Sequence, residues 1–320
     1  NVLHGRSNVP YACLSAGGSS QFAKAPAHFD ALAIIGRTYS GPGINRSWSY
    51  AYGPMNASWD TTCASGCEKT TTVDETAPDG VVTRYTYSNE WGEREGKQIS
   101  VDVNLNATAG RRTTSYTYAP SAGMPYPTSI GGTSTYNSGS RNDLPLTTYT
   151  PTQVTTVAQD GDTFTTTVNS FDAFAKPLSV TRSNSLGAST TDAYEYENNT
   201  TKWVLAQVRK VTNAGTGLVS SEVTYNSDAL PVARYAFGRL LHSYAYNTDG
   251  TLASFSDGAG HATQTSDWYR GIPRTMTFAD NTTQHAEVSD WGWITSITDA
   301  LGDKTCYAYD AMGRVSQVTY

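Results

Sequence analysis

The sequence holds few residues in patterns that support catalysis or metal binding. Five scattered histidines show no metal-ligand spacing: His4, His28, His242, His261 and His285. The His-Glu-x-x-His, Gly-x-Ser-x-Gly and P-loop motifs are absent, and Gly41-Pro42-Gly43 lacks the third glycine of a dinucleotide site. We therefore predict that the chain is not an enzyme and has no catalytic residue, metal ligand or cofactor.

Two short patterns offer limited chemistry. Asp160-Gly161-Asp162 has neither the EF-hand spacing nor a glycine-rich nonapeptide repeat, so a plain hairpin turn is predicted. Cys63 and Cys67 are the one close pair among four cysteines, with a Ser-Gly turn between them. Two interpretations are open for this pair, a disulfide that closes a small loop or two free thiols. A disulfide would imply an oxidising, extracytoplasmic location, and Cys306 is expected to be reduced.

An aromatic cluster near the C-terminus is the remaining candidate site. It consists of Trp268, Tyr269, Trp291 and Trp293. Flat rings on a sheet can stack on a sugar or on the apolar chain of a partner. Cross-strand aromatic pairs are also ordinary sheet stabilisers. Packing within the sheet is the favoured interpretation, and a ligand or partner patch is the alternative.

Composition indicates extended strands and excludes several classes of protein. Charged residues make up 16% of the chain, apolar residues 38%, and tyrosine occurs 21 times. β-branched and aromatic side chains suit a pleated, half-buried surface. The net charge is −6 with acids and bases scattered, which argues against a nucleic-acid or anionic-membrane surface. The longest apolar run, Ala31–Ile35, is far too short for membrane insertion.

The C-terminal part repeats with a period of 21 residues. Three copies of a motif fall on this lattice: Tyr225-Asn226, Tyr246-Asn247 and Tyr309-Asp310. A small residue follows four positions after each lattice point: Ala229, Gly250, Gly271, Gly292 and Gly313. Asn or Asp with a glycine three residues later is turn chemistry, because glycine readily takes positive φ. Each repeat therefore predicts two strands and two turns, with the glycines in the turns, stacked into a continuous antiparallel sheet.

The apolar positions of the second strand in each repeat are three residues apart. Leu252 and Phe255 show this spacing, as do Ile294 and Ile297. Strict strand alternation would put two residues three apart on opposite faces of the sheet. A β-bulge in the second strand would return both residues to one face, so a bulge is predicted there.

The last repeat resembles the YD repeat of the rearrangement-hotspot (Rhs) family. Tyr309-Asp310-Ala311-Met312-Gly313-Arg314-Val315 is similar to the family signature Tyr-Asp-x-x-Gly-Arg-aliphatic, and residues 246–252 and 291–302 resemble further copies. The resemblance covers about residues 159–320, with a weaker echo from about residue 46. It implies a ribbon of β-hairpins that winds into a hollow shell, as in Rhs toxins, toxin-complex encapsulating subunits and teneurins. The Asp-Pro-x-Gly motif at which many members cleave themselves is absent.

These observations define the expected organisation. We predict an all-β chain of consecutive antiparallel hairpins forming a curved or spiralling sheet. Residues 159–320 are the YD-repeat sheet, and residues 46–158 are degenerate β-repeats with long loops. Residues 1–45 have few repeat features. They include a short buried strand expected at Leu32–Ile35 and are a candidate complementary strand or entry segment.

The predicted function is structural. The chain is expected to be a module of a bacterial secreted or surface Rhs-like protein that builds a shell or filament, encloses or delivers an effector, and is extracellular. Its expected partners are the remainder of a longer polypeptide or further copies of itself, together with a C-terminal toxin cargo or a cell-surface glycan. The alternative is an adhesin or glycan-binding module that uses the aromatic sheet surface.

Overall fold

The protein is described from a computed structural model. The described residues are 2–9, 25–53, 69–89, 93–94, 96–107, 109–127 and 149–320, with only the backbone of 2–9 and 25–31. The chain forms two compact units, an N-terminal unit, Asn1–Asp192, and a C-terminal unit, Ala193–Tyr320. Each unit is considered by itself.

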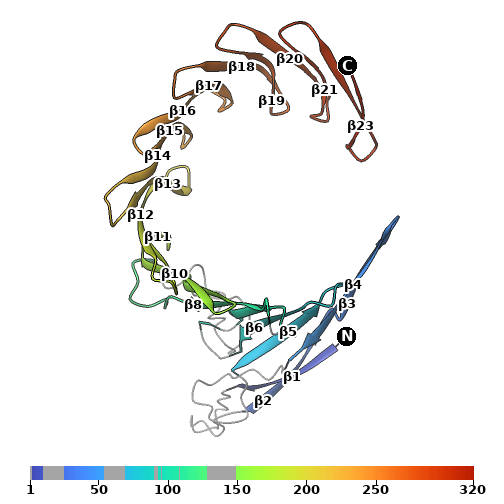
Figure 1. Ribbon diagram of the computed structural model, residues 1–320, viewed down its shortest axis with the longest axis vertical. Coiled ribbons are helices and arrows are strands. Elements are labelled where there is room, and N and C mark those ends of the chain that lie inside the picture. The colour runs from blue at the N-terminus through green and yellow to red at the C-terminus, as the bar shows by residue number, and fades with distance from the viewer. Residues whose placement is uncertain are drawn as a thin grey trace, which may run out of the picture. The chain divides into compact units, whose positions relative to one another are not determined.

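The N-terminal unit is built from antiparallel strands. The first two, β1 (Val2–Val9) and β2 (Ala25–Leu32), pair with each other as a separate two-stranded sheet. The next strands pair in chain order (Figure 1): β3 (Gly36–Gly41), β4 (Ile44–Tyr52), β5 (Thr70–Thr76), β6 (Val82–Ser88), β7 (Gln98–Val103), β8 (Arg112–Tyr118), β9 (Thr152–Gln159), β10 (Asp162–Phe171) and β11 (Pro177–Asn184).

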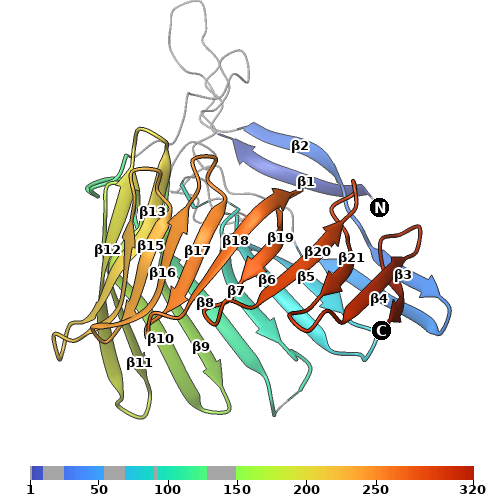
Figure 2. The ribbon, with the colours of Figure 1, turned by 90° about the horizontal axis from the view of Figure 1, so that it is seen from above.

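The C-terminal unit continues the same pattern of pairing between chain neighbours. Strand β12 (Ser189–Asn199) contains the boundary between the units. The strands that follow lie side by side in Figure 2: β13 (Val204–Asn213), β14 (Val219–Tyr225), β15 (Pro231–Ala236), β16 (Arg239–Tyr246), β17 (Leu252–Asp257), β18 (Ala262–Tyr269), β19 (Ile272–Thr277), β20 (Thr283–Val288), β21 (Ile294–Thr298), β22 (Lys304–Tyr309) and β23 (Val315–Thr319).

The predicted all-β antiparallel fold is confirmed. Throughout the described residues the regular elements are strands, and every pair with a defined register is antiparallel. In the same residues there is no helix long and apolar enough to cross a membrane.

The predicted bulge is present in the second strand of the repeats. Tyr246 pairs with Leu252, whereas the preceding Ala245 pairs with Ser254, so Ala253 is an extra residue. The same one-residue shift occurs opposite Val288 and opposite Tyr309. The extra residue returns the first and fourth residues of the strand to one face of the sheet. This geometry accounts for the three-residue spacing of the apolar positions.

A recurring turn follows the repeat tyrosine and closes on the side chain of Asn or Asp. In the last repeat, Oδ1 of Asp310 accepts hydrogen bonds from the backbone N–H groups of Met312 and Arg314, at 2.9 and 3.0 Å. The backbone N–H of Asp310 donates to the carbonyl of Arg314, and that of Gly313 donates back to Asp310. The Asx side chain thus satisfies amides that a turn leaves free.

The same arrangement of two amides on one Asx oxygen recurs in other turns. The acceptors are Asp172, Asn184, Asn226, Asp257 and Asp299. Both turns of a repeat can therefore use this chemistry. Asn and Asp are interchangeable in it because the turn needs only the Oδ1 acceptor.

The repeat glycines lie in turns with a left-handed backbone. Their φ angles are 85° at Gly250, 80° at Gly271, 81° at Gly292 and 77° at Gly313. Ala229 occupies the equivalent position with φ of 62°. A Cβ group makes this conformation unfavourable, so Ala229 is a strained member of the series.

Most strand residues are half-buried, and a compact core occurs only locally in the described residues. In the N-terminal unit, the Tyr126 side chain is 3% exposed and makes an edge contact with the ring of Phe171, with centroids 5.7 Å apart. The Tyr126 hydroxyl donates to the carbonyl of Pro120 at 2.9 Å. The segment after β8 therefore covers the end of β10 and anchors this part of the sheet.

The expectation of a buried strand at Leu32–Ile35 is wrong. Strand β2 ends at Leu32, residues 33–35 are not in a strand, and the Leu32 side chain is 89% exposed. An apolar run is buried only where another element covers it, and here the chain is passing from β2 to β3. The other predicted domain boundaries stay predictions.

Replacing Gly313 by valine should destabilise the last repeat. Valine would take a left-handed φ, and its Cβ would lie 3.0 Å from Cζ2 of Trp293. The expected loss is about 1–3 kcal/mol in the free energy of unfolding, measured by urea denaturation. Ala229→Gly is the matched control with the opposite sign, because glycine relieves the strain at Ala229. Equal stability of Gly313→Val and the wild type would contradict the assigned turn.

The last turn should weaken in acid. Hydrogen bonds from the backbone and side chain of Arg314 lower the pKa of the Asp310 carboxyl below its usual value. A carboxyl whose pKa is lower in the folded state stabilises that state above its unfolded pKa, and this contribution is lost as the pH falls through the folded pKa. The protection factors for amide exchange of residues 310–314, which correct for the intrinsic effect of pH, should therefore fall below about pH 4. Asp310→Asn keeps the Oδ1 acceptor without the charge, so its exchange should lose this pH dependence; an unchanged profile would contradict the assignment.

Candidate functional site: an aromatic face and its hairpin edge

The two faces of the sheet in the C-terminal unit differ in chemistry. Opposed residues of paired strands share a face, so the register assigns each side chain to one side. One side, here called the tyrosine face, carries Tyr244, Phe255, Thr263, Thr265, Met276, Gln284, Ala286, Ile297, Thr305, Tyr307, Tyr309 and Val318. These side chains are aromatic, aliphatic or neutral polar.

The opposite side, here called the polar face, carries small and charged residues. It includes Ser243, Ser254, Gln264, Thr277, His285, Glu287, Ser296, Lys304, Cys306 and Ala308. Lys304 and Glu287 form an ion pair at 3.0 Å, and the Ser296 hydroxyl donates to Glu287 at 2.9 Å. The tyrosine face also carries Arg234 and the opposed pair His242 and Asp257, and Arg274 lies two residues from Met276. From Gln284 to Val318 the opposed residues on this face are uncharged.

A tyrosine hydroxyl links successive repeats across the tyrosine face. The hydroxyl of Tyr309 donates to the carbonyl of Ile294 at 2.7 Å, and that of Tyr246 donates to Pro231 at the same distance. Ile294 and Pro231 are the first residues of β21 and β15, where the bulge disturbs the ladder. Burial raises the pKa of Tyr246 above its usual value, so the phenol stays a neutral donor at alkaline as well as neutral pH.

Trp268 takes the place of this tyrosine in one of the two repeats that lack it, whose lattice positions hold Asp267 and Val288. The indole N–H of Trp268 donates to the carbonyl of Leu252 at 2.9 Å, and Leu252 is the first residue of β17. The preceding Asp267 has φ of 56°. Its left-handed backbone interrupts the alternation and turns Trp268 toward this carbonyl. One member of the predicted aromatic patch therefore makes the link between repeats.

The rest of that patch lies together at one hairpin edge. The rings of Trp291 and Trp293 stack with centroids 6.5 Å apart, and Trp293 lies 5.0 Å from the ring of Tyr309. The hydroxyl of Tyr269 donates to Oδ1 of Asp290 at 2.7 Å. The Trp291 side chain is 81% exposed, whereas Trp293 and Tyr269 are half-buried. Packing thus explains Trp293, and it does not explain Trp291.

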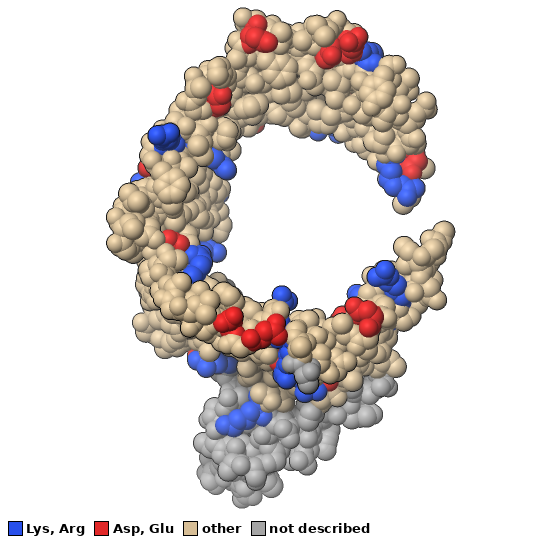
Figure 3. All heavy atoms as spheres, in the orientation of Figure 1, with Lys and Arg blue, Asp and Glu red and all other residues tan. Residues whose placement is uncertain are grey.

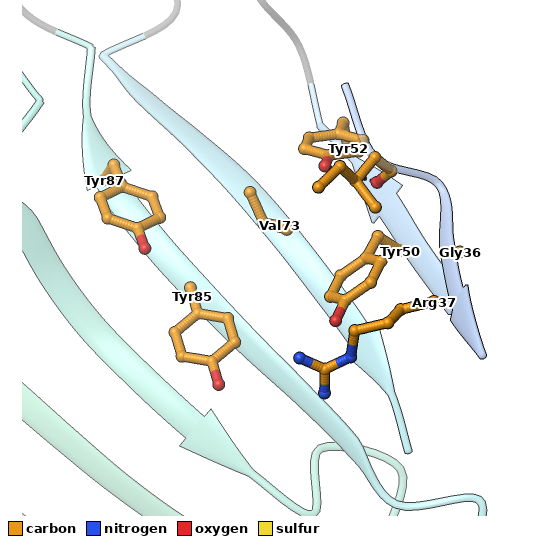
Figure 4. Close-up of a pocket in the computed structure, with 8 residues that line it drawn as sticks. Gly36, Arg37, Tyr50, Tyr52, Val73, Tyr85 and Tyr87 are labelled. Carbon is orange, nitrogen blue, oxygen red and sulfur yellow. Dashed lines mark hydrogen bonds between the residues drawn. The ribbon is translucent and has the colours of Figure 1, made fainter. Parts of the chain in front are cut away.

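The N-terminal unit contains a hollow that the sequence did not reveal. It has a volume of about 700 Å³ and is lined by Ile34, Gly36, Arg37, Tyr50, Tyr52, Val73, Tyr85 and Tyr87. Figure 4 shows the side chains of Arg37, Tyr50, Tyr52, Val73, Tyr85 and Tyr87 on one side of the neighbouring strands β3 to β6. Burial, followed by the nearby Glu75 charge, raises the pKa of Tyr85. The usable signal was the paired Tyr-x-Tyr pattern at residues 50–52 and 85–87.

Arg37 is the cation of this hollow, and aromatic rings hold its guanidinium. Its Cζ lies 4.5 Å from the ring centroid of Trp48 and 5.2 Å from that of Tyr39. Arg84 lies elsewhere, in an ion pair with Asp74 at 2.7 Å. The hollow is therefore largely aromatic with one guanidinium at its margin.

The remaining predictions concern the cysteines and the metal ligands. Cys63 and Cys67 lie outside the described residues, so their disulfide stays a prediction. Cys306 is an exposed free thiol on the polar face. Within the described part of the chain, no group of three or more His, Cys, Asp or Glu side chains is arranged to hold a metal ion.

Removing the Tyr309 hydroxyl should destabilise the last repeats. Tyr309→Phe removes the donor to Ile294 and keeps the ring against Trp293, so the expected loss is about 0.5–1.5 kcal/mol in urea unfolding. Tyr307→Phe is the matched control, because Tyr307 lies on the same face of the same strand and is expected to change stability less. Equal effects of the two substitutions would show that the link to Ile294 does not stabilise the sheet.

Comparisons with known proteins agree with the repeat and the fold. Residues 289–320 match the family model described as RHS Repeat. No curated protein matches the chain significantly. A chain in a structure of the Photorhabdus luminescens Tc holotoxin pore has a TM-score of 0.50 at 12% identity, and the match covers 78% of this chain and 12% of that one. At this identity the likeness shows the fold alone.

A second solved structure gives a weaker likeness. The crystal structure of TcdB2-TccC3-Cdc42 matches with a TM-score of 0.49 at 14% identity, covering 77% of this chain and 12% of that chain. The present chain thus spans a small part of the toxin-complex chains that it matches. Residues 289–320 are an RHS repeat, and the bulged hairpin sheet that contains them is consistent with the Rhs/YD-repeat family.

Proposed function

We propose that the chain is a structural wall module of a secreted or surface-exposed bacterial Rhs-like protein, and that its tyrosine face contacts an enclosed effector polypeptide. The observation that carries the proposal is the separation of the two faces in the last repeats of the C-terminal unit. From Met276 onward, the paired charged residues lie on the polar face, and tyrosine, methionine, isoleucine and valine lie on the other.

The chemistry of the tyrosine face suits contact with a polypeptide of no fixed sequence. Aromatic rings present apolar area with little rotational freedom to lose, and neutral hydroxyls and threonines accept varied polar groups. The last repeats present no paired charged residue on this face, so there it imposes little electrostatic selection on what lies against it. The polar face, with its Lys304–Glu287 pair, suits contact with water. A wall that separates an enclosed chain from solvent needs this asymmetry.

The surface charge supports a wall rather than an electrostatic recognition surface. In the space-filling view of Figure 3, acidic and basic residues are scattered in small groups over a mostly uncharged surface. The net charge of −6 is spread over the chain in the same way. Association with the effector therefore depends on enclosure and apolar contact. The remainder of a longer parent polypeptide or further copies of the chain would complete the wall.

Thiol labelling in the full parent protein tests which face is enclosed. Cys306 on the polar face should react readily with a bulky polyethylene-glycol maleimide. A cysteine introduced as Tyr307→Cys in a Cys306→Ser background is one residue away and on the tyrosine face. It should react at least about tenfold more slowly, since thiol reactivity follows access. Mass spectrometry of the labelled peptide gives both rates.

Unfolding in urea provides the control for this experiment, because both thiols should then react at similar rates. Equal rates in the native protein, or slower reaction of Cys306, would contradict an enclosed tyrosine face. If a cross-linker attached at position 307 recovers a second segment of the parent protein, that segment is the enclosed effector.

A further inference from the structure

We propose that the hairpin edge around Trp291 is a saccharide-binding site for a chain of gluco-configured pyranose units. This site lies on turns, whereas the proposed wall function rests on the strand faces. The two proposals are therefore independent and can fail separately.

The Trp291 ring is exposed and held in place. Its side chain is 81% exposed, and its ring stacks on Trp293 with an interplanar angle of 29°. Trp293 is itself held between Tyr309, 5.0 Å away, and the backbone of Gly313, where a Cβ would lie 3.0 Å from the indole. The support fixes one indole and leaves the neighbouring one open to solvent. Little conformational entropy remains to be lost when a ligand stacks on it.

A hydrogen-bond acceptor and a donor flank this ring. Asp290 precedes Trp291 in the chain, and the Tyr269 hydroxyl holds its Oδ1 at 2.7 Å. Arg270 lies against the same turn, because its Cβ would be 3.6 Å from a Cβ at Gly292. The Arg270 guanidinium lies 5.9 Å from the Tyr269 ring. Among the described residues, neither Asp290 nor Arg270 has an ion pair, so both keep hydrogen-bonding capacity.

A gluco-configured pyranose fits these three groups together. Its equatorial hydroxyls leave axial C–H groups on both faces, and these carry partial positive charge that complements the negative face of an indole. The hydroxyls project from the rim of the ring, where one carboxylate oxygen and a guanidinium can bind adjacent groups. An apolar peptide side chain would use the indole and leave both charges without partners. The acceptor–donor pair beside the ring therefore favours a saccharide.

Trp203 provides a matched control within the same unit. Its side chain is 71% exposed, and the described residues give it no ring contact. It shares exposure and residue type with Trp291 but lacks the stacked support and the flanking pair. If exposed tryptophan alone caused binding, the two residues would contribute equally.

Calorimetric titration of the full chain with cellotetraose tests the proposal. The wild type should bind in the millimolar range, and β-1,4-galactotetraose, with an axial C4–O bond on each ring, should bind more weakly. Trp291→Ala should lower the affinity for cellotetraose at least about tenfold, while Trp203→Ala leaves it unchanged. Trp291→Phe should retain binding because it keeps a flat ring. Circular dichroism confirms that the variants stay folded.

Three results would overturn the proposal. The first is the absence of heat on adding cellotetraose at about ten times the expected dissociation constant. The second is an equal loss of affinity in Trp291→Ala and Trp203→Ala, which would indicate nonspecific contact with exposed indoles. The third is equal affinity for the two tetrasaccharides, which would contradict a preference for gluco-configured rings. Thiol labelling of the strand faces is unaffected by any of these outcomes.

Discussion

The one-residue bulge opposite Tyr225, Tyr246, Val288 and Tyr309, in four of the five 21-residue repeats, is the constraint on which the rest of the sheet depends. Without it, Leu252 and Phe255 would point to opposite sides, and the tyrosine face would alternate apolar and polar residues. The bulge also disturbs the hydrogen-bond ladder at the start of the strand. The next repeat supplies a donor there, from Tyr309 to Ile294 and from Tyr246 to Pro231. Phenylalanine at position 246 or 309 would fill the same space without supplying this donor.

Trp268 shows that the hydrogen bond between repeats can be made by a residue other than tyrosine. Its repeat lacks the Tyr-Asn motif, yet the indole N–H reaches the carbonyl of Leu252, the counterpart of Ile294. To reach it, the backbone takes a left-handed conformation at Asp267. That conformation is unfavourable for a residue with a Cβ, so the compensating hydrogen bond must be worth keeping. The hydrogen bond between repeats is thus kept in a repeat whose sequence has lost the Tyr-Asn motif.

The sequence predicted the parts of this fold that are local. Turn chemistry at Asp310 and Gly313 is decided by residues three or four apart, and the spacing of Leu252 and Phe255 was enough to predict the bulge. Features that depend on residues from several strands were not predictable in this way. The hollow is lined by residues as far apart in the sequence as Arg37 and Tyr85. They come together because β3 pairs with β4, β4 with β5 and β5 with β6, and no short stretch of sequence specifies this order. The prediction of a buried strand at Leu32–Ile35 failed for the same reason, because the burial of these residues depends on which element covers them.

A sheet with little core outside the region of Tyr126 must obtain its stability from neighbouring strands. Neighbouring repeats then depend on the turns, on the bulges where the register shifts, and on the links from Tyr246, Trp268 and Tyr309, as in other linear repeat proteins. Strand residues are constrained twice, by the face that they occupy and by the partner across the ladder. Residues at the turn tips, such as Trp291 and Met312, are constrained by neither and are strongly exposed. A substitution at the hairpin edge can therefore be accepted without disturbing the paired strands, and Trp291 lies at such a position.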